Sequence, residues 1–397
     1  MFETLQATPA DPILALMLGF RNDERSDKVD LGVGIYKDAN GQTPVMKAIK
    51  LAEQKLHDEQ DSKSYVSPSG DIAFCDAIEQ LTFGQAIPTE RIKAIQTPGG
   101  SGALRVLADM LIAANPQATT WVSDPTWPNH LPLLVQAGHK LERYPYYDAE
   151  RGKVDFDAMH ATLSKAKAGD IVLLHGCCHN PTGADLDLTQ WQAVADLCRK
   201  NGLLPFVDQA YQGFGDGLEQ DAAGLRLLAQ ELPELVVASS SSKNMALYRE
   251  RAGCALIVAD SETAATNTAS LAVKAIRANY SMPPDHGAAL GRIVLGDDHL
   301  KTIWQEELES MRSRMVGLRE NFAAALRKRS NSDRFDYIAQ QRGMFSRLPL
   351  SEEQVTRLRV ENGIYMVGDG RFNVAGIPED SADSIDSLAE RIVAVTN

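Results

Sequence analysis

The 397-residue sequence lacks any apolar run of the roughly 20 residues needed to cross a bilayer. The first segment, MFETLQATPADPILALMLGF, has no basic residues before its apolar run, so it does not fit a secretory signal. Cysteine is scarce, with five residues, and Cys177 and Cys178 are adjacent. An odd number with this spacing favours reduced thiols over a disulfide framework. We therefore expect a cytoplasmic protein that does not bind membranes.

Positive charge is also in short supply. The chain has 40 Lys and Arg against 53 Asp and Glu, which gives a formal net charge of −13. Nucleic-acid binding depends on clustered basic residues, so this balance disfavours a nucleic-acid-binding protein. A GxxxxGK[ST] motif and a complete dinucleotide fingerprint are both missing, which disfavours a P-loop ATPase and a nicotinamide enzyme.

The composition that remains is that of a globular enzyme, with 44% hydrophobic and 23% charged residues. The length predicts two domains. Short apolar runs alternate with helix-like segments at 119–125, 140–147, 170–183, 203–211, 235–243 and 254–260. Such alternation predicts an α/β fold with a mostly parallel sheet, whose ligands bind beyond the carboxyl ends of the strands.

Residues 300–330 predict one long amphipathic helix. Its apolar residues recur at steps of three or four and are Trp304, Leu308, Met311, Met315, Leu318, Phe322 and Leu326. We interpret this helix as the bridge into a second, smaller domain.

Two polar clusters at the ends of apolar runs suggest a binding site. The segment TPGGSGALR, residues 97–105, is a glycine-rich turn before a helix, where free N–H groups suit an anion, although it could be only a flexible helix start. Asp208 ends an apolar run, with Tyr211 three residues later. A buried carboxylate needs a cation or several donors, unless Asp208 is simply a helix N-cap.

The segment HGCCHNPTG, residues 175–183, invites a metal-site interpretation because two histidines flank two cysteines. If the segment is a strand, a rise of about 3.3 Å per residue places His175 and His179 about 13 Å apart, too far to share a metal. We therefore expect no metal. Asn180 and Pro181 predict a turn that presents the Asn180 amide at the sheet edge.

Lys243 follows four serines in ASSSSKNMALYRER. A lysine at a strand end is usually a solvated charge. Here, however, an anion cradle, a carboxylate, a phenol, an amide and a lysine all follow strands, and pyridoxal 5′-phosphate requires this set. The lysine forms a Schiff base with the cofactor's aldehyde, and the carboxylate keeps the pyridine nitrogen protonated.

These motifs carry a resemblance that covers essentially the whole chain. The sequence resembles the aspartate/aromatic amino acid aminotransferases, class I of the fold-type I pyridoxal-phosphate enzymes. The matching segments, in order, are ADPILAL, LGVGIYKD, TPGGSGALR, DPTWPNH, HGCCHNPTG, VDQAYQGF, SSSSKNMALYRER, IRANYSMPP, RGMFS and GRFNVAG. The resemblance implies a large cofactor-binding domain at 45–310, a small domain from 12–44 and 311–397, and an N-terminal arm at 1–11 that wraps a partner subunit.

The resemblance also implies roles at the cofactor. Lys243 would form the internal aldimine and, once displaced by substrate, move a proton. Asp208 would pair with the pyridine nitrogen, and Tyr211 with the ring oxygen. The remaining implied cofactor contacts are Asn180 to the ring oxygen, Trp127 stacked on the ring, and Gly100, Ser101, Gly102, Ser240, Arg251 and a partner subunit's Tyr65 at the phosphate. His130 would support Asp208, and His175 would lie in the layer behind the cofactor.

For the substrate, the resemblance implies that Arg371 binds the α-carboxylate, with Gly34, Asn180 and Trp127 nearby. Arg277 would reach in from the partner subunit to a distal carboxylate, so each site of a homodimer would borrow residues. The expected activity is ping-pong transamination between aspartate or glutamate and 2-oxoglutarate or oxaloacetate, with aromatic amino acids also accepted. A mainly aromatic aminotransferase, a β-lyase or decarboxylase, and a non-catalytic cofactor-binding protein are alternatives.

Two positions depart from the family pattern where the substrate would bind. Met282 stands where asparagine or serine is usual, which removes a polar partner near Arg277. Asp369 precedes Arg371 by two residues, so it could compete for the arginine if both side chains point the same way along a strand.

Overall fold

The computed structural model describes residues 2–7, 12–379 and 382–396. Seven strands form its main sheet in the order β2-β10-β9-β8-β7-β3-β4. Their bounds are β2 Ile92–Pro98, β3 Thr119–Asp124, β4 Lys140–Pro145, β7 Ile171–His175, β8 Leu204–Gln209, β9 Leu235–Ser240 and β10 Ala252–Val258. β10 is antiparallel to both neighbours, and the other strand pairs of this sheet are parallel. The expected α/β fold with a mostly parallel sheet is confirmed.

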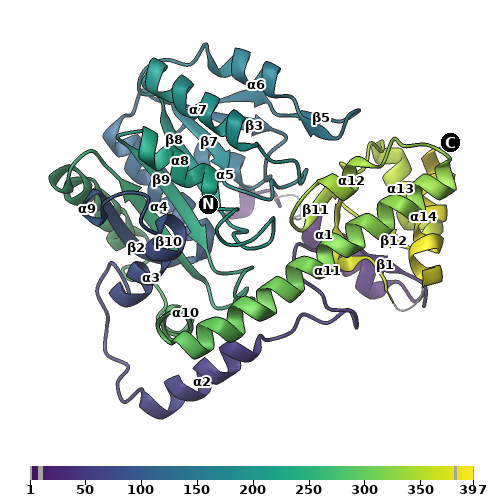
Figure 1. The fold of residues 1–397 in the computed structure, drawn as a ribbon, viewed down its shortest axis with the longest axis horizontal. Coiled ribbons are helices and arrows are strands. Elements are labelled where there is room, and N and C mark those ends of the chain that lie inside the picture. Colours follow the sequence, from purple (N-terminus) through teal and green to yellow (C-terminus); the bar gives the residue numbers. More distant parts are fainter. Residues whose placement is uncertain (1, 8–11, 380–381, 397) are drawn as a thin grey trace.

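Helices cover both faces of this sheet (Figure 1). Because successive strand residues point to opposite faces, Leu173 and Phe206 pack with α4 (Gly99–Ala114) and α9 (Glu262–Asn279). Val172 and Val207 belong to the core on the other face, with α7 (Leu188–Asn201) and α8 (Ala223–Glu231). Every residue of β9 and β10 is buried, as expected for strands covered on both sides. The polar residues that follow these strands are therefore held by a rigid support.

The remaining elements around the main sheet are mostly helical. They are α2 Lys47–Glu59, α3 Ile72–Phe83, η2 Thr89–Arg91, α5 His130–Gln136, β5 Tyr147–Asp148, β6 Lys153–Val154, α6 Phe156–Leu163 and α10 His286–Gly296.

The long helix expected at 300–330 is confirmed as α11 (Asp298–Ser330). It begins where the Asp297 side chain accepts hydrogen bonds from the N–H groups of His299 and Leu300, and it ends at Asn331 in a left-handed conformation. All seven apolar residues predicted to line its packed face are buried. α11 runs from the main sheet to a second group of elements (Figure 1).

That second group combines the two ends of the chain. It contains α1 Pro12–Asn22, β1 Val29–Asp30, α12 Tyr337–Gln340, β11 Phe345–Arg347, α13 Glu352–Asn362, β12 Ile364–Tyr365, β13 Arg371–Asn373, η3 Val374–Gly376 and α14 Ala382–Thr396, and a short 3-10 helix, η1 Phe2–Thr4, lies near the N-terminus. β1 pairs with β12, and β11 pairs with β13. The exact domain boundaries stay a prediction. Part of the expected N-terminal arm, residues 1 and 8–11, lies outside the described residues.

Within the described residues, no helix has the length and apolar character needed to span a membrane.

Candidate active site

A pocket of about 270 Å³ opens at the carboxyl ends of β7, β8 and β9, beside the start of α4. Residues from α1 and from the β11–β13 pair close its other side. Twelve predicted residues line it: Gly34, Gly100, Ser101, Trp127, His175, Asn180, Asp208, Tyr211, Ser240, Lys243, Arg251 and Arg371. The pocket therefore brings together residues that the strand ends suggested, such as Asp208 and Lys243, and residues that only the resemblance implied, such as Gly34 and Arg371.

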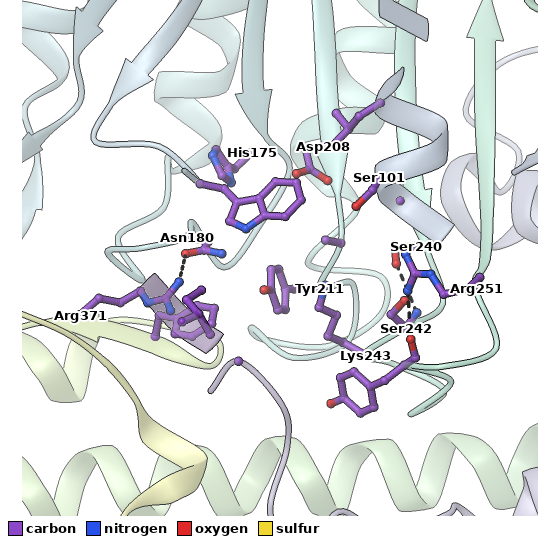
Figure 2. A pocket seen from close by; sticks show the side chains of 18 residues that line it. Ser101, His175, Asn180, Asp208, Tyr211, Ser240, Ser242, Lys243, Arg251 and Arg371 are labelled. Atoms are coloured by element: carbon purple, nitrogen blue, oxygen red, sulfur yellow. Dashed lines mark hydrogen bonds between the residues drawn. The ribbon is translucent and has the colours of Figure 1, made fainter. Parts of the chain in front are cut away.

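Lys243 projects into the middle of this pocket, beside Tyr211 (Figure 2). Its Nζ lies 5.0 Å from the centroid of the Tyr211 ring. Burial lowers the pKa of Lys243 although the Asp208 carboxylate opposes this, and the nearby Arg251 lowers the pKa further. A lowered pKa increases the share of neutral amine, which is the nucleophilic form.

Asp208 is buried, with 7% of its surface exposed, yet it is held ionised. Burial alone would raise its pKa, but the hydrogen bond from His130 and electrostatic attraction to neighbouring groups, Lys243 among them, bring the pKa below the usual value. His130 Nε2 lies 3.0 Å from Asp208 Oδ2. The pocket thus contains a fixed negative charge that does not depend on a bound cation.

A line of hydrogen bonds behind Asp208 orients His130. Thr126 Oγ1 lies 2.8 Å from His130 Nδ1 and 3.2 Å from His175 Nε2. A carboxylate can only accept, so His130 Nε2 donates to Asp208, and Thr126 Oγ1 lies between the two imidazole rings. Burial lowers the pKa of His175 to about 3, so its ring stays neutral. The expected place of His130 behind the carboxylate agrees with this geometry.

The opposite end of the pocket is suited to an anion. α4 starts at Gly99 with no side-chain cap, so the N–H groups of its first turn remain available. A Cβ on Gly100 would lie 2.9 Å from the Cβ of Ser240, so this close approach requires glycine. The Arg251 guanidinium donates to the carbonyls of Tyr248 at 2.9 Å and Pro98 at 3.5 Å, neither of which neutralises its charge.

Arg371 lies across the pocket from Arg251, next to Asn180 (Figure 2). It is 4% exposed. Its guanidinium donates to Asn180 Oδ1 at 3.4 Å and to the Gly32 carbonyl at 3.2 Å, and its buried Nε has no hydrogen-bond partner among the described residues. The Phe345 ring lies 4.6 Å from its Cζ. A buried arginine with only neutral partners is well suited to bind a carboxylate.

Asp369 does not compete for the Arg371 guanidinium. Its Oδ1 accepts from the backbone N–H of Arg371, and its Oδ2 lies 3.9 Å from Arg347 Nε. The residue lies in the turn before β13, which begins only at Arg371, so the strand alternation assumed from the sequence does not apply. The competition considered from the sequence is therefore absent from this structure.

Four predicted residues do not line the pocket. Gly102 lies in the first turn of α4, where a Cβ would meet Pro98, and His130 contacts Asp208 from behind. Tyr65 is 92% exposed. Arg277, at the end of α9, is exposed and donates to Ser281 Oγ at 2.5 Å. The last two were expected to act on a partner subunit's site, which a single chain does not contain.

Six lining residues were not predicted: Ile13, Leu104, Ala210, Ser242, Tyr248 and Phe345. Ser242 is adjacent to Lys243 and Tyr248 follows it by five residues, so their proximity in sequence could have indicated that they line the pocket. Phe345 lies in the RGMFS segment quoted for the resemblance, but its apolar ring gave no sign of proximity to Arg371.

The expected spacing of His175 and His179 is wrong. Their ring centroids are 4.1 Å apart, not about 13 Å. β7 ends at His175, and Cys178 adopts a left-handed φ of 52°, so the chain turns back and brings the rings together. Burial lowers the pKa of His179 well below its usual value, so this ring is neutral as well.

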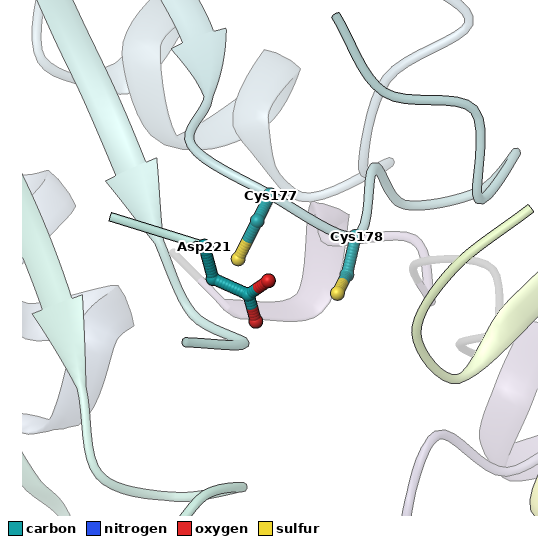
Figure 3. A group of neighbouring side chains, drawn as sticks. All are labelled: Cys177, Cys178 and Asp221. Atoms are coloured by element: carbon teal, nitrogen blue, oxygen red, sulfur yellow. The ribbon is translucent and has the colours of Figure 1, made fainter. Parts of the chain in front are cut away.

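The turn also brings the Cys177 and Cys178 thiols close to the Asp221 carboxylate (Figure 3). Among the described residues this is the one group of three such side chains spaced closely enough to hold a metal. The Asp221 carboxylate, however, accepts from the backbone N–H groups of Gly213, Gly215 and Asp216. Burial raises the pKa of Cys178 to about 12, which keeps that thiol protonated. Asp221 therefore anchors the 213–216 loop.

Comparisons with known proteins point to one family. The sequence matches the family "Aminotransferase class I and II" over residues 26–392. The aromatic-amino-acid aminotransferase of Paracoccus denitrificans and the aspartate aminotransferase of Escherichia coli strain K12 are each 48% identical to it, over 100% of both chains. A solved aromatic amino acid aminotransferase with 3-indolebutyric acid superposes with a TM-score of 0.96 at 47% identity, covering 100% of each chain. The enzyme from Burkholderia pseudomallei, covalently bound to pyridoxal phosphate, gives 0.96 at 40% identity, also over 100% of each chain.

Proposed function

Since the chain belongs to the class I and II aminotransferase family, we propose that it transfers amino groups between aspartate or glutamate and 2-oxoglutarate or oxaloacetate by a ping-pong route. The cofactor is pyridoxal 5′-phosphate. One observation carries this proposal: the desolvated Lys243 lies between an anion cradle and the ionised Asp208, opposite the buried Arg371.

The donor set fits the cofactor. Arg251, Ser240 and the first turn of α4 would hold its phosphate, because they offer charge and free N–H groups where side chains are excluded at Gly100. Asp208 would face the pyridine nitrogen, and Tyr211 and Asn180 the ring oxygen. When bound, pyridoxal phosphate supplies an aldehyde and an aromatic ring that accepts electrons from the substrate's Cα.

The chain's own residues divide the remaining work. The Lys243 amine, whose lowered pKa increases its neutral share, would be the nucleophile and the group that moves the proton at the substrate's Cα. Asp208, kept ionised by His130, holds a proton at the pyridine nitrogen. Burial raises the pKa of Tyr211, so its phenol stays protonated and can donate a hydrogen bond. Arg371 fixes the α-carboxylate and so orients the Cα–H bond.

We further propose a homodimer in which the partner subunit's Arg277 binds the distal carboxylate and the partner subunit's Tyr65 reaches the phosphate. The exposure of both side chains in the single chain supports this proposal. The five cysteines are free and buried, which supports a cytoplasmic location.

Replacement of Arg277 by alanine should lower kcat/KM for aspartate by about 10²- to 10³-fold, because a carboxylate then loses its charged partner on binding. Activity with phenylalanine, which has no distal carboxylate, should change by less than about threefold. Steady-state kinetics with both amino acids measure this ratio. Lys274→Ala, an exposed charge on the same helix, serves as the control. Equal losses on the two substrates would refute the assigned role.

Aromatic amino acids are the second candidate substrate class. The Arg277 guanidinium already has a polar partner in Ser281 Oγ, outside the pocket. An arginine with such an alternative partner need not be buried unpaired against an aromatic ring. This contact supports dual use of the site, with a mainly aromatic enzyme as the alternative. A non-catalytic binder would not need the lowered lysine pKa, and a β-lyase or decarboxylase has no specific support here.

Met282→Asn should shift the preference toward aspartate by about three- to tenfold. An amide near Arg277 would add about one hydrogen bond to its guanidinium and so restrain the guanidinium from moving away when an aromatic substrate binds. The ratio of kcat/KM for aspartate to that for phenylalanine is the measurement. Met282→Leu, which retains the apolar character, should leave the ratio unchanged. An unchanged ratio in Met282→Asn would contradict a role for this position in specificity.

A further inference from the structure

Arg319, in the C-terminal half of α11, is a buried cation outside the pocket. Its exposed fraction is 1%. Within the described part of the chain, all five of its side-chain hydrogen bonds go to one segment, residues 338–346, which we call the clamp loop. The acceptors are the carbonyls of Ile338 at 3.1 Å, Arg342 at 3.1 Å, Gly343 at 2.8 Å and Phe345 at 2.6 Å, and Ser346 Oγ at 2.5 Å.

No carboxylate is among these acceptors, and the buried Nε of Arg319 has no hydrogen-bond partner among the described residues. Burial lowers the pKa of Arg319 to about 9. Burying such a group is costly, and the cost is offset here by bonds that fix a backbone segment. A planar guanidinium can reach several carbonyls at once, whereas a lysine ammonium offers a single donor centre.

The clamp loop forms part of the pocket wall. Phe345 follows Met344 in the loop, and its ring lies against Arg371 and edge-on to Tyr211, with centroids 6.2 Å apart. A Cβ on Gly34 would lie 2.8 Å from the same ring. The position of Phe345 therefore determines the space on one side of the Arg371 guanidinium.

The other side of Arg371 is fixed through the same loop. The Arg342 backbone N–H donates to the Gly183 carbonyl at 2.8 Å. A Cβ on Gly183 would lie 2.3 Å from the Phe345 carbonyl, so the loop and the turn at 180–183 are in close contact. That turn carries Asn180, which accepts a hydrogen bond from Arg371. Two neighbours of Arg371, Phe345 and Asn180, thus lie on segments that the clamp loop holds together.

We propose that Arg319 is a positioning residue for the α-carboxylate subsite: it fixes the clamp loop and, through Phe345 and the 180–183 turn, the geometry around Arg371. The inference rests on the proposed function, because it takes Arg371 as the group that binds the substrate carboxylate. Arg319 itself does not touch the substrate. It acts on carboxylate affinity, whereas the proposed phosphate contacts at the far end of the pocket, Arg251, Ser240 and the first turn of α4, lie outside the segments that it fixes.

The test is Arg319→Lys, which keeps the positive charge and removes the planar guanidinium with its several N–H donors. The KM for amino acids should rise about tenfold. The Kd of succinate, a dicarboxylate without an amino group, should rise by the same factor when it is measured by calorimetry on the cofactor-loaded enzyme. The values of kcat and of the Kd for pyridoxal phosphate should stay within about threefold. Arg327→Lys, an exposed arginine of the same helix paired with Asp336, should match the wild type.

Ser346→Ala provides a milder second variant, which removes one Arg319 acceptor and should weaken succinate binding by about threefold. A variant with a lower melting temperature but unchanged KM and succinate Kd would show that Arg319 only stabilises the fold, and would overturn the inference. Parallel losses in cofactor binding and kcat would overturn it as well. If the wild type does not transaminate but binds succinate, and Arg319→Lys weakens that binding, the proposed function fails while the positioning role stands.

Discussion

Replacement of Lys243 by alanine is expected to abolish transamination almost completely, with a loss of at least about 10⁴-fold in the first half-reaction. The reason is that one side chain supplies both the nucleophile and the proton-transfer group. Its position in the pocket and its lowered pKa suit both roles, and the described lining residues include no second lysine. The rate of oxo-acid formation from aspartate under single-turnover conditions is the measurement.

The variant should still bind the cofactor, because Arg251, Ser240, Asp208 and the first turn of α4 are unchanged. Its visible absorption should lack the band of a lysine Schiff base. Lys200→Ala, an exposed lysine at the end of α7, is the matched control and should retain full activity. Residual activity within about tenfold of wild type would show that another group carries the proton, and would remove Lys243 from the mechanism.

Replacement of Arg371 by lysine should lower kcat/KM by about 10²- to 10³-fold for aspartate and phenylalanine alike. Both substrates carry an α-carboxylate, and a lysine cannot reproduce two parallel hydrogen bonds. Arg371 Nε is buried and has no hydrogen-bond partner in the described part of the chain, and its two guanidinium contacts are long, 3.4 Å to Asn180 and 3.2 Å to Gly32. The guanidinium therefore has capacity for this carboxylate.

The contrast with Arg277→Ala makes this prediction specific. Arg371→Lys should reduce activity on both substrates, and Arg277→Ala should reduce it on aspartate only. Arg347→Lys, on the adjacent strand β11 with its guanidinium near Asp369, is a suitable control for a change of charge geometry close to the subsite. If Arg371→Lys affected aspartate alone, the two arginines would have exchanged roles.

Much of the site could be predicted because the polar residues follow strands. The parallel order places the carboxyl ends of β7, β8 and β9 at one edge, so Asp208 and Lys243 had to lie near each other. The glycine-rich start of α4 could be recognised as a candidate anion site because the free N–H groups of a helix start are suited to an anion. Lys243, in contrast, could be interpreted as a cofactor-binding lysine only together with the other polar residues at that edge.

The features of the site that the sequence did not predict depend on contacts between segments far apart in the chain. In the sequence, Arg319 looks like an ordinary charged residue of a long amphipathic helix. Nothing in the sequence indicates that five hydrogen-bond acceptors from residues 338–346 surround its side chain. Phe345 likewise has no polar chemistry to mark it. The error at His175 and His179 arose because a strand was extended past its end, where the left-handed Cys178 reverses the chain.

The central claim is that Lys243, Asp208 and Arg371 together transfer an amino group through pyridoxal phosphate. The most direct measurement is a single half-reaction, in which the purified protein is loaded with the cofactor and then mixed with aspartate, or separately with phenylalanine, without any oxo acid. The account predicts loss of the visible absorption band, appearance of the pyridoxamine form, and one equivalent of oxo acid per site with each amino acid. A stable visible band that responds to neither amino acid would contradict it.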